Sequence, residues 1–129
     1  MHEMIQPEDW KPALGYANAI AASGRTIFLA GQIGWNADQI FETEDFAGQV
    51  EQALRNIRTI LEQAGGAPEH LVRLTWFVTD KQAYLQNQKA IGAAYREIIG
   101  RHFPAMSVVE VSALLEDKAK VEIEATAVV

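Results

Sequence analysis

The chain has 129 residues, no cysteine, and 17 acidic against 11 basic side chains, which gives a formal net charge of -6 at pH 7. This length suits one domain, and we expect residues 1–129 to form it. The lack of cysteine excludes a disulfide scaffold, a thiol nucleophile and any metal centre with cysteine ligands. The acidic balance disfavours nucleic acid and anionic membranes as partners, because both bind basic surfaces.

The sequence also lacks membrane and export signals. No apolar stretch approaches the roughly 20 residues that a membrane-spanning helix requires. Residues 1–7 have neither the basic start nor the apolar segment of a secretory signal peptide. We therefore expect a cytoplasmic protein without a membrane partner.

The first part of the chain predicts a β-hairpin. Residues 16–22 and residues 26–32 are rich in strand-forming side chains, and the turn at residues 23–25 separates them. Two such segments joined by a short turn with glycine are typical of antiparallel pairing. Residues 33–44 contain several turn-forming residues and predict a loop.

The next segment predicts an amphipathic helix from Phe46 to Ala64. Its apolar residues recur at steps of three and four, which places them on one helical face. Thr43 or Asp45 can cap the first turn, and a glycine pair follows the last one. The residues of this face are Phe46, Val50, Ala53, Leu54, Ile57, Ile60, Leu61 and Ala64.

The second half of the chain predicts three strands and one helix. Residues 71–78 alternate between apolar and polar side chains, as a half-buried strand does. We expect a helix from about Lys81 to Ile99, followed by strands at residues 105–113 and 119–129. The apolar residues expected on one face of this helix are Tyr84, Leu85, Ile91, Tyr95, Ile98 and Ile99.

The resulting order, β-β-α-β-α-β-β, predicts an α+β fold in which two helices cover one face of a single mixed sheet. The other face is partly apolar, and no third helix is available to cover it. We therefore predict a closed homo-oligomer in which another subunit covers that face. Strand alternation assigns to it Met106, Val108, Glu110, Glu122 and Glu124.

The residues form no known metal or nucleophile motif. His2, His70 and His102 lack metal-ligand spacing, and no serine lies in a nucleophile motif. Glu122 and Glu124 are two apart on one strand, so both point to the same side. A glutamate in a subunit cleft can act as a general base or orient a water molecule, and a solvated or salt-bridged strand face is the alternative.

Gly92 lies inside the predicted second helix, where glycine costs about 1 kcal/mol relative to alanine. Two explanations remain open for it. One is close packing of the helix against the sheet, and the other is space for a ligand.

Four segments of the chain resemble the RidA/YjgF family, also called the translation-inhibitor family. They are LAGQIG, QVEQALRNIRTILEQAGG, LVRLTWFVTD and the ending FPAMSVVEVSALLEDKAKVEIEATAVV. The likeness extends from about Gly15 to Val129 and implies a chorismate-mutase-like fold, a homotrimer, and small-molecule clefts between subunits. It also implies hydrolysis of reactive enamines and imines, such as 2-aminoacrylate, to 2-keto acids and ammonia without a metal or organic cofactor.

The resemblance also assigns roles to individual residues. Glu122 matches the glutamate thought to hold the attacking water, Tyr16 matches a cleft tyrosine, and Gly31 lies in the strand-glycine segment that lines the cleft. Four further cleft positions differ from the family. Its arginine, cysteine, serine and asparagine correspond here to Met106, Val108, Ala30 and Gly92.

Met106 changes the expected substrate. An arginine fork binds a carboxylate, whereas methionine has no charge and no donor. The resemblance therefore implies a neutral or more apolar imine, enamine or labile metabolite in place of 2-aminoacrylate. The alternatives are a trimeric ligand-binding or regulatory protein without deaminase activity, and an RNA-directed activity, which the net charge of -6 disfavours.

Overall fold

A four-stranded sheet forms the centre of the fold, and the computed structural model describes residues 2–129 of the chain. The strands are β3 (Thr26–Ile33), β4 (Leu71–Val78), β5 (Ala105–Glu110) and β6 (Val121–Val128), in the spatial order β3-β6-β4-β5. β6 runs antiparallel to both neighbours, and β4 and β5 run parallel. The predicted α+β fold with a mixed sheet is therefore confirmed.

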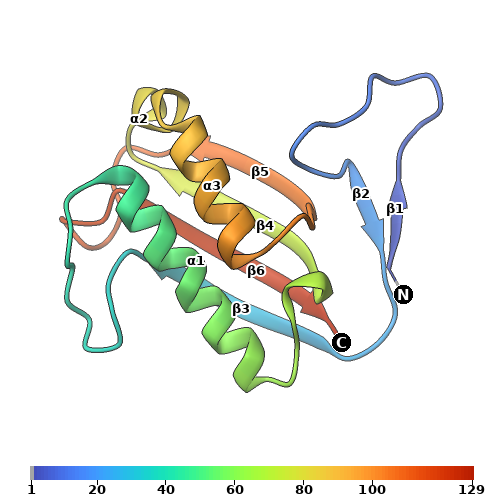
Figure 1. Ribbon diagram of the computed structural model, residues 1–129, viewed down its shortest axis with the longest axis horizontal. Helices are drawn as coiled ribbons and strands as arrows, with labels where there is room; N and C mark the ends of the chain where they lie inside the picture. The colour runs from blue at the N-terminus through green and yellow to red at the C-terminus, as the bar shows by residue number, and fades with distance from the viewer. Residues whose placement is uncertain (1) are drawn as a thin grey trace.

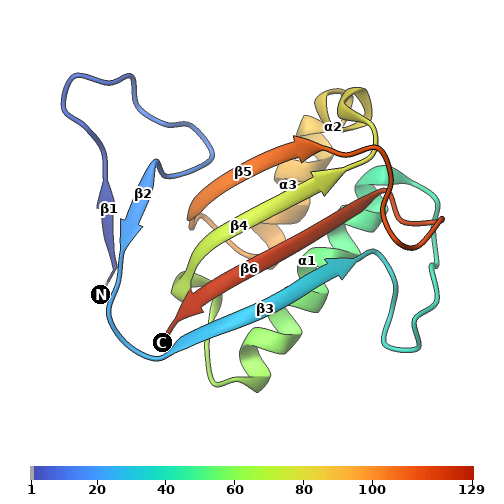
Figure 2. The ribbon, with the colours of Figure 1, turned by 180° about the vertical axis from the view of Figure 1, so that it is seen from behind.

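The helices lie on one side of this sheet. They are α1 (Phe46–Gln63), α2 (Lys81–Gln86) and α3 (Gln88–Ile98), and the short 3-10 helix η1 (Pro68–His70) precedes β4 (Figure 1). The view from behind shows no helix over the other face of the sheet, called the open face below (Figure 2). Within residues 2–129, no helix is long and apolar enough to cross a membrane.

The core lies between α1, α3 and the sheet. Six of the eight residues of the apolar stripe predicted for α1 are buried there, with Val50, Leu54 and Ile57 fully buried. Of the other two, Ile60 is 38% exposed, and Ala64 follows the last helical residue and is half-buried. Burying one such side chain contributes about 1.5–3 kcal/mol relative to leaving it exposed. Asp45 caps α1, since its carboxylate accepts a hydrogen bond from the Gly48 N–H at 2.8 Å. β6 adds the side chains of Val121, Ile123, Ala125 and Ala127 to this core.

A buried glutamine ties α1 to two loops. Gln49 has no exposed surface, and it uses both ends of its amide. Its Nε2 donates to the backbone oxygens of Thr43 and Lys118 at 3.2 and 3.0 Å, and its Oε1 accepts from the Lys120 N–H at 2.8 Å. These bonds hold the end of the β5–β6 loop against the helix, immediately before β6 begins.

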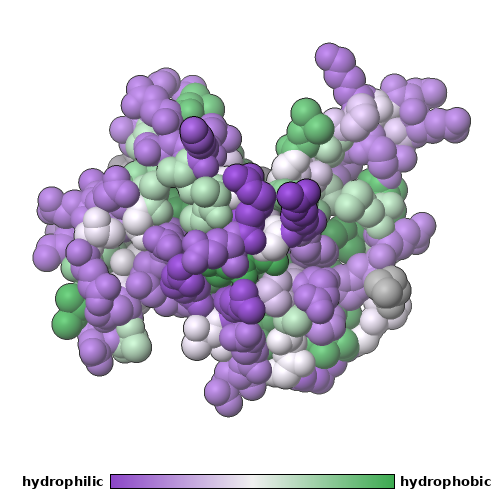
Figure 3. All heavy atoms as spheres, in the orientation of Figure 1, coloured by the Kyte–Doolittle hydropathy of each residue, from purple (hydrophilic) through white to green (hydrophobic). Residues whose placement is uncertain are grey.

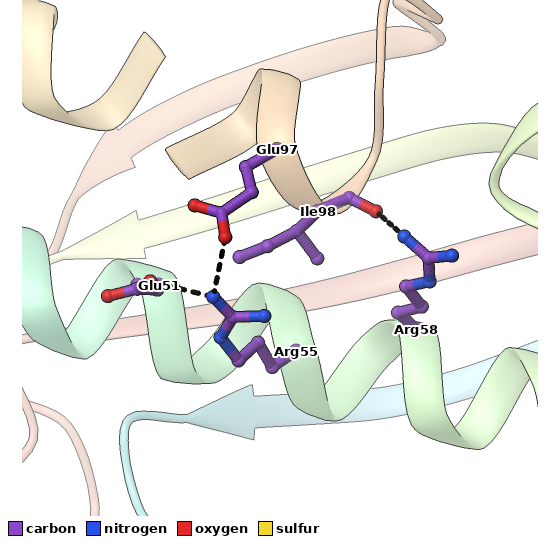
Figure 4. Close-up of polar contacts among 5 residues, drawn as sticks. All are labelled: Glu51, Arg55, Arg58, Glu97 and Ile98. Carbon is purple, nitrogen blue, oxygen red and sulfur yellow. Dashed lines mark hydrogen bonds and ion pairs between the residues drawn. The ribbon is translucent and has the colours of Figure 1, made fainter. Parts of the chain in front are cut away.

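Polar contacts also join α1 to the end of α3 (Figure 4). Arg55 pairs with Glu51 of its own helix at 2.9 Å and with Glu97 of α3 at 3.3 Å. Arg58 donates to the backbone oxygen of Ile98 at 2.7 Å, which satisfies a carbonyl group at the helix end. Because both ion pairs are exposed to solvent, they contribute little to stability, and of the two it is the Arg55–Glu97 pair that joins α1 to α3.

The predicted hairpin of residues 16–22 and 26–32 is wrong. Residues 19–21 form β2 (Ala19–Ala21), which pairs with β1 (Glu3–Ile5) in a separate two-stranded sheet beside the main one (Figure 1). β3 pairs with β6 instead, beginning with hydrogen bonds in both directions between Arg25 and Val129 at 2.9 Å. A turn signal is local, so it shows where the chain bends and not which distant strand pairs with it.

The predicted second helix, Lys81–Ile99, is broken into α2 and α3 at Asn87. The Asn87 side chain donates to the Ala83 backbone oxygen at 2.7 Å and so competes with the hydrogen bonds of the helix. The break changes the helical phase, and Leu85, predicted to be buried, is 52% exposed. β5 is also shorter than predicted and ends at Glu110.

Candidate functional site

Three of the five residues predicted for the open face lie on the helix-covered side. Met106 and Val108 pair with Leu74 and Trp76, which are buried beneath the helices. Glu110 follows on the same side, where its carboxylate accepts a hydrogen bond of 2.7 Å from the first N–H of α2. The prediction was wrong because alternation shows which residues share a face, whereas the pairing between strands decides which face that is.

A pocket of about 360 Å³ lies on the helix-covered side, within the size range of small-molecule sites. Figure 3 shows the surface notched between α2 and the part of the chain that holds β1 and β2, with apolar side chains beside the notch. Four residues expected at a binding site line this pocket together: Tyr16, Gly92, Met106 and Val108. They are called the pocket group below.

The segment before β2 brings Tyr16 to the pocket. Ala17 is buried, its N–H donates to the Pro104 oxygen at 3.0 Å, and it forms a parallel bridge with Ala105 at the start of β5. This anchor holds Tyr16 next to the first residues of β5. The Tyr16 side chain is 43% exposed, so its ring lies at the rim, where a ligand can reach it.

Aromatic side chains form much of the pocket wall. Tyr95 stacks on Phe103 with ring centroids 5.3 Å apart, and Trp76 meets Tyr84 edge to face at 6.0 Å. The Tyr95 hydroxyl donates to the His102 backbone oxygen at 2.6 Å, and burial raises the pKa of this phenol above its usual value. The Tyr95 side chain is therefore an uncharged part of the pocket wall and does not act as a general acid or base.

Among residues 2–129, Arg96 is the one charged side chain that lines the pocket, and no motif in the sequence points to it. A Cβ on Gly92 would lie 3.3 Å from Arg96 Nη1 and near no atom of the sheet. This finding favours open space beside the helix as the role of Gly92 over close helix–sheet packing. The sequence feature that could have revealed Arg96 is its position four residues after Gly92, because residues four apart lie on the same side of a helix.

The open face carries the other predicted site residues. A Cβ on Gly31 would lie 2.3 Å from Glu122 Oε2, so the carboxylate lies directly against the glycine backbone. β3 bulges here, because Ala30 and Gly31 both fall between the pairs Leu29–Ala125 and Gln32–Ile123. Within residues 2–129, Glu122 makes no side-chain hydrogen bond or ion pair, which leaves its carboxylate free to bind a ligand or water.

The predicted site residues thus form two groups on opposite sides of one sheet. The pocket group lines the pocket on the helix-covered side, and the open-face group lies on the uncovered side. Because the sheet separates them, a single copy of the chain does not bring both groups to one ligand. The open-face group consists of Ala30, Gly31 and Glu122.

The three histidines gather elsewhere, around a second hollow near the start of β4. A ring nitrogen of His2 lies 3.2 Å from the His70 backbone oxygen, and one of His102 lies 2.7 Å from the Leu71 backbone oxygen. Their partners are thus backbone groups. In the described part of the chain, no group of three or more His, Asp or Glu side chains is placed to hold a metal ion.

Comparisons with known proteins show the family. The sequence profile of the family described as endoribonuclease L-PSP matches residues 7–129. The chain is 36% identical to an Escherichia coli K12 protein named 2-iminobutanoate/2-iminopropanoate deaminase, over 99% of this chain and 98% of that protein. The chain belongs to the RidA/YjgF family.

Other RidA/YjgF relatives agree in sequence and in fold. A RutC family protein of Aquifex aeolicus is 32% identical over 99% of both chains. The crystal structure of YyfB from Yersinia pestis, described as a protein of unknown function of the conserved Rid family, matches with a TM-score of 0.88. That structure is 33% identical and covers 99% of this chain and 98% of its own, so the fold implied by the resemblance is confirmed.

Proposed function

We propose that the chain is a RidA/YjgF-family deaminase that hydrolyses a reactive imine or enamine in clefts between the copies of a homotrimer. The observation that carries the proposal is the separation of the pocket group from the open-face group by the sheet. A neighbouring copy can supply to each pocket the carboxylate that the pocket's own chain directs away from it. The name of the Escherichia coli relative supports this type of reaction.

The composition of the open face supports association between copies. Phe28 is 81% exposed there, and Phe77 and Val109 add apolar surface that no helix covers (Figure 2). Contact between the open face of one copy and the pocket edge of the next is head-to-tail, and such contacts close into a ring. A trimer has one complete site at each contact. A solution mass other than that of three chains would contradict this assembly.

Glu122 is the proposed group that activates water. The water oxygen bonds to the carbon of the C=N group while the Glu122 carboxylate accepts a water proton. The nitrogen takes up the proton held by Glu122, which gives an amino alcohol, and it then receives the remaining hydroxyl proton through Glu122. The carbon–nitrogen bond breaks as the oxygen forms a carbonyl group, and ammonia leaves. An enamine enters the same sequence after protonation of its carbon gives the imine.

The pocket group favours a substrate with a larger apolar part than 2-aminoacrylate has. On the β5 wall, Met106 and Val108 offer neither a charge nor a strong donor, and aromatic rings cover much of the rest. Apolar contact contributes about 25 cal/mol for each Å² removed from water. Imines with aromatic or branched aliphatic side chains therefore gain more from this pocket than a three-carbon substrate does.

The test is ammonia release from imines that amino-acid oxidases and amine oxidases generate in situ. We expect the protein to accelerate hydrolysis of imines with aromatic or branched side chains and to act weakly on 2-aminoacrylate. A preference for 2-aminoacrylate contradicts the proposed substrate. No acceleration with any imine, together with saturable binding of the carbonyl products, supports the alternative of a non-catalytic ligand-binding protein.

The contact between Gly31 and Glu122 gives a further prediction. In Gly31→Ala, the new methyl group would overlap Glu122 Oε2 and Cδ, which lie 2.3 and 2.7 Å from the Cβ position. The overlapping atoms are the end of a flexible side chain, so the carboxylate moves and the fold is retained. We expect kcat to fall at least about tenfold, as for a misplaced general base. Steady-state kinetics and thermal unfolding check this, and an unchanged kcat shows that the position of the carboxylate is immaterial.

A further inference from the structure

Arg96 gives the pocket a single positive charge. It lies in the last turn of α3, and the other lining residues in the described part of the chain are uncharged. Gly92 leaves space for its guanidinium, because a Cβ there would lie 3.3 Å from Nη1. Any larger side chain at position 92 would displace the guanidinium from this place or fill the pocket beside it.

The Arg96 guanidinium has no partner among residues 2–129 of its own copy. Within residues 2–129 it makes no ion pair and no side-chain hydrogen bond, whereas Arg55 of α1 holds the adjacent Glu97 (Figure 4). A guanidinium presents five donors in a planar fork that matches the two oxygens of a carboxylate. Arg96 is exposed to solvent at the edge of the pocket, so the carboxylate of an incoming ligand can reach it.

We infer that Arg96 is the carboxylate receptor of this pocket, so that the substrate is an anionic 2-imino acid with an aromatic or branched side chain. The inference rests on the proposed deaminase function and names its substrate class. The carboxylate pairs with α3, while the apolar side chain packs on Met106, Val108 and the aromatic wall. The neutral substrate expected from Met106 is then not required, because another element supplies the cation.

The experiment compares two imines that differ only in the carboxylate. An amino-acid oxidase forms the first from phenylalanine, and an amine oxidase forms the second from 2-phenylethylamine. We expect the wild-type protein to have a higher kcat/KM for the first imine. Arg96→Gln should lower kcat/KM for that imine about 10- to 100-fold, mainly through KM, as for the loss of a charge-assisted hydrogen bond. For the second imine we expect a change of less than about twofold.

Two further variants separate a specific role from a change of net charge. Arg101→Gln removes one positive charge just beyond α3, from a residue that does not line the pocket, and should leave both imines unaffected. Arg96→Lys keeps the charge but loses the planar fork, so it should restore part of the affinity for the anionic imine. Equal effects of Arg96→Gln and Arg101→Gln, or equal losses for both imines, overturn the inference while the deaminase function stands.

If the wild-type protein hydrolyses neither imine, the proposed function fails. A binding measurement then still tests the role of Arg96. Calorimetric titration with 3-phenylpropanoate and with 3-phenylpropanamide then tests the receptor directly. Tighter binding of the carboxylate than of the amide, lost in Arg96→Gln, supports the inference. Equal binding of both compounds, or a carboxylate preference that survives Arg96→Gln, overturns it.

Discussion

Glu122→Gln is expected to abolish nearly all imine hydrolysis while leaving fold and assembly intact. Glutamine keeps the size of the side chain but does not accept a proton from water, so kcat should fall roughly 100- to 10,000-fold. The fold should tolerate the change because Glu122 makes no side-chain hydrogen bond within the described residues. Single-turnover rates, thermal unfolding and the solution mass measure these effects.

Glu124→Gln is the matched control for this variant. Glu124 lies two residues further along β6, on the same open face, and loses the same charge. We expect its kcat to stay within about twofold of the wild-type value, since the residue does not touch the Gly31 backbone. A similar loss in both variants would assign the effect to the charge of the open face and not to the Glu122 carboxylate.

Mixing two inactive variants shows whether each site is built from two copies. Glu122→Gln retains an intact pocket, and Gly92→Leu retains an intact carboxylate while its new side chain fills the pocket. After unfolding and refolding together in equal amounts, about a quarter of the head-to-tail contacts combine an intact pocket with an intact carboxylate. About a quarter of the wild-type activity should therefore return. No recovery in mixed trimers would contradict a site shared between copies.

Gln49→Leu is expected to give the largest loss of stability. The leucine fills a similar volume but leaves the Thr43 and Lys118 oxygens and the Lys120 N–H without their partner. Each unsatisfied group costs about 1–3 kcal/mol, so we expect a loss of about 3 kcal/mol or more. Urea unfolding at a fixed protein concentration measures it, because assembly makes stability depend on concentration.

Gln63→Leu serves as the control for the buried glutamine. Gln63 is the last residue of α1 and is exposed to solvent, so the same exchange removes no buried hydrogen bond. We expect its effect on the free energy of unfolding to stay within about 0.5 kcal/mol. An equal loss in both variants would indicate that the exchange acts through the helix itself and not through the two loops that Gln49 holds.

Local patterns in the sequence predicted the elements that carry strong periodicity. Most of the α1 stripe, the alternation of β4 from Leu74 onward and the buried face of β6 lie where their spacing placed them. Each of these patterns repeats within one element, so neighbouring residues suffice to reveal it. The Asn87 break was missed because a side chain that bonds to the backbone four residues earlier ends a helix without altering its apolar spacing.

The sequence by itself determined the fold class and the family, and it predicted the four residues Tyr16, Gly92, Met106 and Val108 that the structure brings to one pocket. Only the tertiary structure decided that β2 pairs with β1, that Met106 lies beneath the helices, and that Glu122 lies on the open face. It also brought Arg96 to the pocket. The reason is that strand partners and pairing register depend on contacts between residues far apart in the chain, and a shift of one residue moves every side chain of a strand to the other face.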